Sequence, residues 1–459
     1  MTLLRKIRTV FSLDAAIVFN LLGTARSLIG GPLLALLIAA HFTPEVQGYY
    51  FTFASILGLQ VLADLGLGTV LVQFAAHEWA GLAREVDGRI SGHAENRSRL
   101  ASLTRFAMQW YGGGALVAMV LLLVAGTLFL TTRSSEAIAW RWPWCFLAVM
   151  ASTRLALTPL LSLLEGCKQI ASVQAYRLWE GTQTIVVSGV AVLLGAGLWT
   201  LGIASAFSVI SCLGFVVLRH GKFYRGLLAW PVDVRISWKH ELLPMQWRIA
   251  LSSISGYFVF QLFTPVMFRY QGAVEAGRMG MTLYLVSAVG SLAGAWINTR
   301  VPIFGALVAQ RKWGELDSLA LRSGVATVSA ALLAAIGALL GIHILELYFP
   351  ELASRFLGIG TSMYFLGAVV LGQVTFIESV YLRAFRREPF LRISLVTAVL
   401  TGLSTWQLGR TFGSHAVAMG YFSIIFFVAL PVCTWILIRS RRDWCGSGTP
   451  ARQSPDAVS

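Results

Sequence analysis

The sequence predicts an all-α integral membrane protein with about twelve transmembrane helices. Of its 459 residues, 56% are hydrophobic and only 12% are charged, and the mean hydropathy is +0.71. Long apolar stretches recur along almost the whole chain with short polar connections between them. Spanning backbone is either helical or part of a closed barrel, and stretches of about 20 residues have the length of helices rather than of barrel strands.

The predicted spans form two six-helix bundles, at 1–220 and 247–440. A basic cytoplasmic linker at 221–246 joins them, and a polar tail at 441–459 is predicted to be disordered. The twelve spans are 14–41, 48–77, 105–131, 142–165, 178–197, 199–219, 247–269, 278–302, 322–347, 355–382, 390–408 and 414–438.

The positive charges predict the orientation of these spans. Most of the 36 lysines and arginines fall in connections on the same side as both termini, and cytoplasmic loops are enriched in these residues. Both termini are therefore predicted to be cytoplasmic. The net charge of +15 reflects this topology and an affinity for anionic membrane lipids, rather than nucleic acid binding.

A weak internal repeat accompanies this pattern. The connections at 82–100 and 308–321 mix apolar and charged residues at helical spacing, which predicts an interfacial amphipathic helix after the second span of each half. The halves also share identities at an offset of 230 residues: Glu45 with Glu275, Thr69 with Thr299, and Phe74 with Phe304. Two halves of equal orientation predict parallel repeats related by an axis along the membrane normal.

Several catalytic motifs are absent from the sequence. There is no GxxxxGK[ST] phosphate loop, no HExxH motif and no GxSxG motif. The five cysteines include no CxxC pair and have no nearby histidines, so neither a metal site nor a disulfide framework is predicted. We expect a protein that is not an enzyme and has no cofactor, and any active transport would draw on an ion gradient or on consumption of the substrate.

Three segments of the first half carry a family resemblance. The runs at 41–51 (HFTPEVQGYYF), 64–68 (DLGLG) and 73–78 (QFAAHE) resemble the Wzx-type polysaccharide flippases of the multidrug/oligosaccharidyl-lipid/polysaccharide (MOP) superfamily. The run at 272–277 (GAVEAG) echoes the pattern in the second half. The resemblance implies a MATE-like fold of two bundles that rock about a central cavity.

The resemblance also implies a function and a location. Such carriers move a polyprenyl-pyrophosphate-linked oligosaccharide, a repeat unit of O-antigen, exopolysaccharide or capsule, across the bacterial inner membrane by alternating access. The implied partners are this glycan, membrane lipids, and the polysaccharide polymerase with its chain-length machinery. An ion-coupled drug antiporter of the same superfamily is the alternative.

Two arginines interrupt predicted spans and are the leading substrate-binding candidates. Arg26 lies near the middle of the first span and Arg154 near the middle of the fourth, where an ionisable group is costly and marks function. Arginine binds phosphate oxygens bidentately and stays charged. For Arg26 a neutralising pair with Asp64 is an equal alternative. For Arg154 no acid of matching depth is evident in its own hairpin, and the alternative is contact with backbone or polar neighbours.

Three further arginines lie at helix ends in the second half. Arg248 and Arg300 are predicted at cytoplasmic ends and Arg269 at an outer end, where each could meet the pyrophosphate in one state of the transport cycle. Their ordinary role would be to anchor the helix ends at the membrane surface.

Asp64 and Glu378 are carboxylates within predicted spans. A carboxylate that alternates between charged and neutral forms can couple proton or sodium movement to transport. Glu165 and Glu180 are instead expected to pair with Lys168 and Arg177. A drug antiporter would favour acidic cavity residues, and a membrane polymerase or ligase would need a large external loop, which the sequence lacks.

Overall fold

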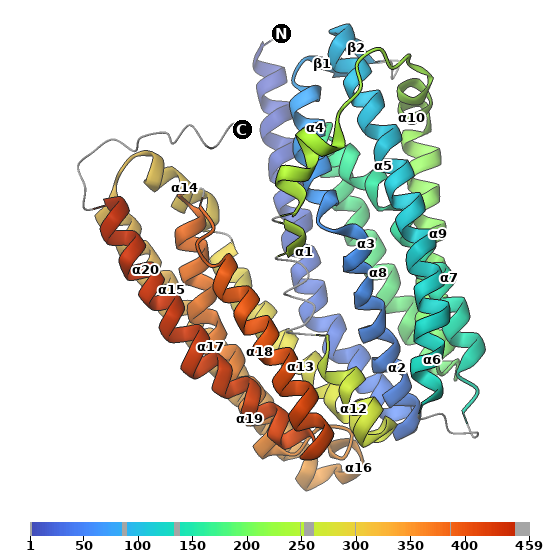
Figure 1. Ribbon diagram of the computed structural model, residues 1–459, viewed down its shortest axis with the longest axis vertical. Helices are drawn as coiled ribbons and strands as arrows, with labels where there is room; N and C mark the ends of the chain where they lie inside the picture. The colour runs from blue at the N-terminus through green and yellow to red at the C-terminus, as the bar shows by residue number, and fades with distance from the viewer. Residues whose placement is uncertain are drawn as a thin grey trace. The chain divides into compact units, whose positions relative to one another are not determined.

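Two compact helical units make up the chain, Met1–Met281 and Thr282–Ser459. The computed structural model describes residues 2–84, 90–132, 138–247, 249–251, 261–298, 300–385 and 387–445. Nearly all of them are helical (Figure 1), with one small antiparallel ribbon formed by β1 (Leu82–Arg84) and β2 (Ile90–Gly92).

The first unit is built mainly from helices. They are α1 (Thr2–His41), α2 (Pro44–Leu57), α3 (Val61–Asp64), α4 (Leu67–Trp79), α5 (Ala94–Leu121), α6 (Thr127–Thr131), α7 (Arg141–Gly166), α8 (Ile170–Leu193), α9 (Trp199–Gly214), α10 (His220–Ala229), α12 (Phe263–Gln271) and the start of α13 (Ala273–Asn298). α1 packs along α8, and α7 contacts α4, α5 and α9.

The second unit contains the remainder of α13 and the helices that follow it. These are α14 (Val301–Ala309), α15 (Trp313–Tyr348), α16 (Pro350–Ala353), α17 (Ile359–Arg383), α18 (Leu391–Thr411), α19 (Ser414–Ile424) and α20 (Leu430–Cys445). α17 packs against α15, α19 and α20.

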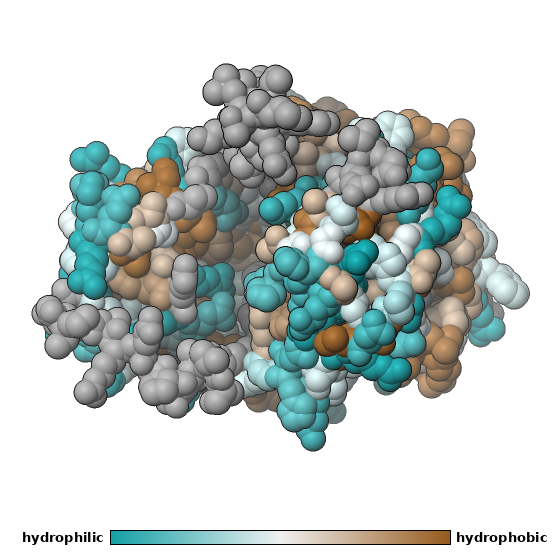
Figure 2. All heavy atoms as spheres, turned by 90° about the horizontal axis from the view of Figure 1, so that it is seen from above, coloured by the Kyte–Doolittle hydropathy of each residue, from teal (hydrophilic) through white to brown (hydrophobic). Residues whose placement is uncertain are grey.

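The membrane character predicted from composition is confirmed. Within the described ranges, nine helical segments are long and apolar enough to cross a membrane, and they overlap nine of the twelve predicted spans. Figure 2 shows hydrophilic residues gathered on the end face that bears the β1–β2 ribbon, with hydrophobic residues on the flanks.

Three predicted spans are not among these nine. α8 and α18 are helices at the positions of the fifth and eleventh predicted spans. The seventh, at 247–269, includes residues outside the described ranges. The count of twelve and the cytoplasmic placement of both termini stay predictions.

The predicted interfacial helix at 82–100 is wrong, whereas the one at 308–321 is in part helical. Within 82–100 the chain forms the β1–β2 ribbon and then enters α5 at Ala94, because Gly92, at φ +133°, adopts a backbone conformation that no helix accommodates. Within 308–321, α14 ends at Ala309 and α15 begins at Trp313, so most of this segment is the first part of α15, and its interfacial position stays a prediction.

The segment at 230–246 is docked on α5. The Ser98 hydroxyl accepts hydrogen bonds from the backbone N–H groups of Asp233 and Val234, at 2.8 and 2.9 Å. Arg99 bridges Glu78, at 2.8 Å, and Glu241, at 2.5 Å. This segment is therefore part of the first compact unit, and the units divide after Met281. The predicted division into two six-helix bundles stays a prediction.

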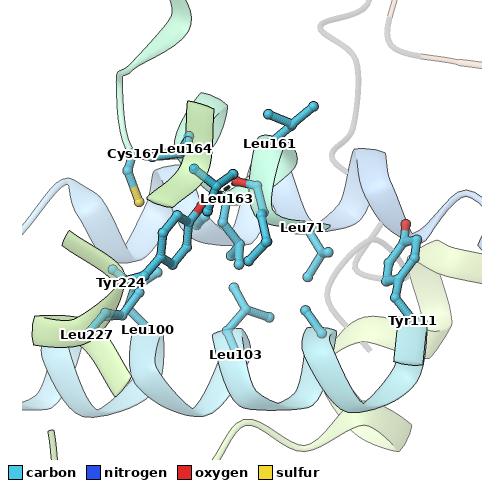
Figure 3. Packing of buried hydrophobic residues seen from close by; sticks show 14 of the residues in the cluster. Leu71, Leu100, Leu103, Tyr111, Leu161, Leu163, Leu164, Cys167, Tyr224 and Leu227 are labelled. Atoms are coloured by element: carbon cyan, nitrogen blue, oxygen red, sulfur yellow. Dashed lines mark hydrogen bonds between the residues drawn. The ribbon is translucent and has the colours of Figure 1, made fainter. Parts of the chain in front are cut away.

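A hydrophobic cluster in the first unit supports the site described below. It joins side chains of α4, α5, α7 and α10, among them Leu71, Leu100, Leu103, Leu163, Tyr224 and Leu227. Figure 3 shows Tyr111 at one end of this cluster with its hydroxyl directed away from α5. Tyr111 is only 1% exposed, so the cluster holds its ring in place.

The starts of α2 and α13 cross at two glycines. A Cβ on Gly48 would lie 1.9 Å from the carbonyl oxygen of Ala273, and one on Gly277 would lie 2.9 Å from the Gly48 nitrogen. The Gln47 side-chain amide donates to the Gly277 carbonyl at 3.0 Å. Gln47 and Gly277 are 230 residues apart, the offset of the sequence identities, so two segments related by the predicted repeat meet here.

Replacement of Gly48 by alanine should destabilise this crossing. The new Cβ would meet backbone, which cannot rotate away, so we expect a loss of about 1–3 kcal/mol in the free energy of unfolding. Thermal unfolding of the purified protein in detergent measures the effect. Gly113→Ala is the matched control, because a Cβ there meets nothing within 4 Å. Equal unfolding midpoints for the two variants would contradict the crossing.

Candidate functional site

The second predicted span is interrupted in the middle. Residues 44–64 run as one helical segment and α4 begins at Leu67. Between them, Leu65 and Gly66 have positive φ angles of 46° and 69°. Glycine adopts this left-handed conformation readily, but for leucine it costs about 1–2 kcal/mol. Irregular backbone at membrane depth is tolerated only where it is buried in protein or lines a cavity.

A cavity of about 630 Å³ lies beside this helix break. Most of its lining residues are polar or charged. They are Gln60, Val61, Asp64, Gly68, Thr69, Val72, Gln73, Leu155, Thr158, Ser162, Glu165 and Arg177, from the α2–α4 region, α7 and α8. With one cationic and two anionic side chains, the lining carries a formal charge of −1.

Asp64 is held by two donors. The Gly66 backbone N–H donates to Oδ2 at 3.1 Å, and the Tyr111 hydroxyl donates to Oδ1 in a short hydrogen bond. One carboxylate oxygen therefore stabilises the turn into α4 while the other faces α5.

A second carboxylate lines the same cavity. Glu165 forms an ion pair with Arg177, with 2.8 Å between Oε2 and Nη2, and it also accepts a hydrogen bond from Gln174. The predicted pairing of Glu165 is confirmed.

Arg26 lies on the face of α1 that packs against α8. A Cβ on Gly181 would lie 1.5 Å from Arg26 Nη1, so the guanidinium occupies the space that a side chain on α8 would take. Arg26 Nη2 donates to Ser27 at 2.9 Å. Its Nε and Nη1 atoms are buried and have no hydrogen-bond partner among the described residues. The alternative of a pair with Asp64 is not found, since Asp64 bonds to Tyr111 and Gly66.

Arg154 is paired, contrary to the expectation that no acid matches it. Its Nε and Nη2 donate to both oxygens of Glu180 on α8, at 2.7 and 3.0 Å. Ser208 on α9 hydrogen-bonds to both partners. The predicted pairing of Glu180 with Lys168 or Arg177 is therefore wrong, because Arg154 reaches Glu180 from the neighbouring helix.

The candidates of the second half are not gathered into this site. Arg248 lies outside the described residues. Arg269 is near the end of α12, exposed, in the first unit, whereas Arg300 precedes α14 in the second and lies over the Trp296 ring at 5.4 Å. Glu378 in α17 is 7% exposed and accepts a hydrogen bond from Thr434 at 2.7 Å.

Sequence reasoning missed the residues that complete both charged sites. Tyr111, Ser162 and Gly181 carry no signal, because each is an ordinary residue of an apolar helix. The helix break did carry a signal. An aspartate followed by Gly66 and Gly68 within a span marks irregular backbone. Where the structure describes the chain, no group of three or more His, Cys, Asp or Glu side chains could hold a metal ion.

Removal of one partner from the Arg154–Glu180 pair should be strongly destabilising. With side-chain exposures of 23% and 16%, loss of one partner leaves the other charge uncompensated. We expect Arg154→Met to lower the free energy of unfolding by about 3 kcal/mol, and Arg154→Met with Glu180→Met to recover most of it. Thermal or denaturant unfolding in detergent measures both. A double variant no more stable than Arg154→Met would contradict the prediction, because it would show that the uncompensated charge of Glu180 does not cause the loss.

Comparisons with known proteins identify the fold. No family model matches the sequence, and no curated protein matches it. Among solved structures, an inward-facing multidrug resistance MATE family transporter of the MOP superfamily aligns over 95% of this chain and 100% of its own, with a TM-score of 0.67 and 14% identity. Lipid II flippase MurJ, inward closed, aligns over 93% and 87%, with a TM-score of 0.61 and 10% identity.

A third solved structure bears on pocket chemistry. It is a MOP superfamily transporter from Pyrococcus furiosus, described as having a binding pocket of reverse polarity that suggests a different function. It aligns over 95% of this chain and 96% of its own, with a TM-score of 0.52 and 13% identity. These likenesses show that the chain has the fold of MOP superfamily transporters and flippases.

Proposed function

We propose that this chain, which has the MOP transporter fold, is a flippase for a polyprenyl-pyrophosphate-linked oligosaccharide in the bacterial inner membrane. The observation that carries the proposal is Arg26. It is a membrane-embedded arginine with two buried nitrogens that have no partner among the described residues. A cation at that depth is expensive and is retained for function.

The surroundings of Arg26 suit an anionic headgroup. Gly181 leaves the guanidinium against the α8 backbone and provides no competing side chain. Two partnerless N–H groups on a planar fork match two oxygens of a phosphate. A pyrophosphate would thus satisfy Nε and Nη1, which otherwise lose solvation when buried.

The other arginines take different parts in this proposal. Arg154 is neutralised by Glu180, so its role is to hold α7 against α8 unless transport opens the pair. Arg248, Arg269 and Arg300 remain proposed contacts for the pyrophosphate during entry and release. The transported polyprenyl-pyrophosphate-linked oligosaccharide would pass to a polysaccharide polymerase and its chain-length machinery.

Energy for the cycle would come from an ion gradient. Asp64 borders a polar cavity and Glu378 is a buried carboxylate in the second unit. Either can bind a proton or sodium ion and release it as its helix neighbours move. No cofactor is needed for this chemistry.

An ion-coupled drug antiporter is the second candidate. The specific observation in its favour is the cavity at the helix break, which carries Asp64 and Glu165 against Arg177. A surplus of negative charge attracts cationic molecules rather than pyrophosphate. The two candidate functions therefore predict different substrate-binding residues. A flippase would bind its anionic substrate at Arg26, and an antiporter would bind its cationic substrate at Asp64.

Flipping assays with Arg26 variants test the proposal. In proteoliposomes that contain a fluorescent polyprenyl-pyrophosphate oligosaccharide, we expect Arg26→Met to reduce the flipping rate at least about tenfold, the equivalent of one charged hydrogen bond. Gly181→Ala should also slow flipping, because its Cβ displaces the guanidinium without removing the charge.

Two controls accompany these variants. Arg225→Met removes an exposed arginine of α10, and Gly113→Ala adds a methyl group in open space. Unaltered flipping by Arg26→Met would refute the assigned role of Arg26. Uptake of a cationic dye without any glycolipid flipping by the wild-type protein would establish the antiporter instead.

A further inference from the structure

We propose that the helix break at Asp64 binds a sodium ion between Asp64, Tyr111 and Ser162. The proposal deepens the coupling role assigned to Asp64 and to that extent rests on the proposed function. It names the ion, its oxygen ligands and the position in α4 that leaves room for it.

Three side-chain oxygens surround one empty position. A Cβ on Gly68 would lie 3.3 Å from the Tyr111 hydroxyl and 3.5 Å from both Asp64 Oδ1 and Ser162 Oγ. Gly68 has an ordinary helical conformation within α4, so alanine would suit its backbone better. Its missing side chain is what leaves the oxygens facing open space.

Ser162 provides the third oxygen, which faces the cavity. Its side chain is 6% exposed and lines the cavity. Its hydroxyl oxygen is not among the buried polar atoms that lack a partner, so it is open to the cavity and can be reached from there. A cation or its bound water would contact this oxygen from the cavity.

The charges and backbone favour a cation over an anion. The cavity lining carries a surplus of one negative charge, since Glu165 is already paired with Arg177. The helical segment 44–64 ends at Asp64 and presents its carbonyl end to the break. Carbonyl ends of interrupted membrane helices coordinate sodium in other transporter folds. The N-terminal end of α4 has a different partner, because the backbone N–H of Gly66 donates a hydrogen bond to Asp64 Oδ2.

Tyr111 sets the position of the ligand oxygen. Its hydroxyl hydrogen is used in the bond to Asp64 Oδ1, which leaves oxygen lone pairs for an ion. The hydrophobic cluster shown in Figure 3 fixes the ring, so the oxygen pair is preorganised. Hard oxygen ligands of this kind suit sodium, and the remaining coordination positions open to the water of the cavity.

A bound ion would affect the strained turn at Leu65 and Gly66 and the contact between this turn and Ile249. A Cβ on Gly66 would lie 2.3 Å from Cγ2 of Ile249, so the turn packs directly on the segment that precedes α12. Neutralisation of Asp64 by an ion changes the charge that holds the Gly66 N–H. Ion binding and release would therefore alter the contact with Ile249.

Sodium binding to the purified full-length protein tests the site. Radioactive sodium binding and thermal unfolding are measured in detergent, with choline chloride replacing sodium chloride at constant ionic strength. We expect saturable binding by the wild type and a sodium-dependent rise in the unfolding midpoint. Asp64→Asn and Gly68→Ala should each weaken binding at least about tenfold, a loss typical of damaged metal sites.

Gly113→Ala is the matched control and should bind sodium like the wild type, since its added methyl group also lies in a helix but meets nothing within 4 Å. Absence of saturable sodium binding, or unchanged binding by Gly68→Ala, would overturn the site. A midpoint that responds to pH but not to sodium would overturn it in favour of a proton.

The same preparations separate this inference from the proposed function. Glycolipid flipping without sodium binding would remove the sodium site and leave the flippase. Sodium binding lost in Gly68→Ala, together with dye uptake but no glycolipid flipping, would leave the site and remove the flippase.

Discussion

Backbone polar groups have no water to bond with inside a membrane, and the break in the second span must satisfy this constraint. The Leu65–Gly66 turn removes regular hydrogen bonds from the middle of a helix. Asp64 compensates at Gly66, Tyr111 holds Asp64, and the cluster on α5 and α7 holds Tyr111. These groups support the irregular backbone at Leu65 and Gly66, and the cavity lies beside it.

The same constraint governs the charges within the helices. Arg154 donates hydrogen bonds from Nε and Nη2 to both carboxylate oxygens of Glu180. Its charge is therefore neutralised, and the pair is part of the packing of α7, α8 and α9. Arg26 is different, since two of its buried nitrogens lack partners in the described part of the chain. Two arginines with similar positions in the sequence pattern therefore differ in the structure, since one is paired between helices and the other has unsatisfied N–H groups.

Some features of both sites follow from local sequence, and others do not. The depth of Arg26, Arg154 and Asp64 within apolar stretches was predictable, because charged residues stand out in such a pattern. The pairing of Arg154 with Glu180 was not predictable, since those residues are 26 positions apart on separate helices. Gly181 and Ser162 could not be singled out, because their importance comes from the atoms of other helices that face them.

The sequence by itself determined membrane residence and the approximate positions of the helices, because hydrophobic length and the bilayer thickness act locally along the chain. It also placed Gly66 and Gly68 next to Asp64. Only the tertiary structure decided that Asp64 and Gly68 line a cavity with Ser162, that Tyr111 donates to Asp64, and that Arg26 faces Gly181. Partnership between charges depends on which helix faces lie together, and the packing of separate helices decides that.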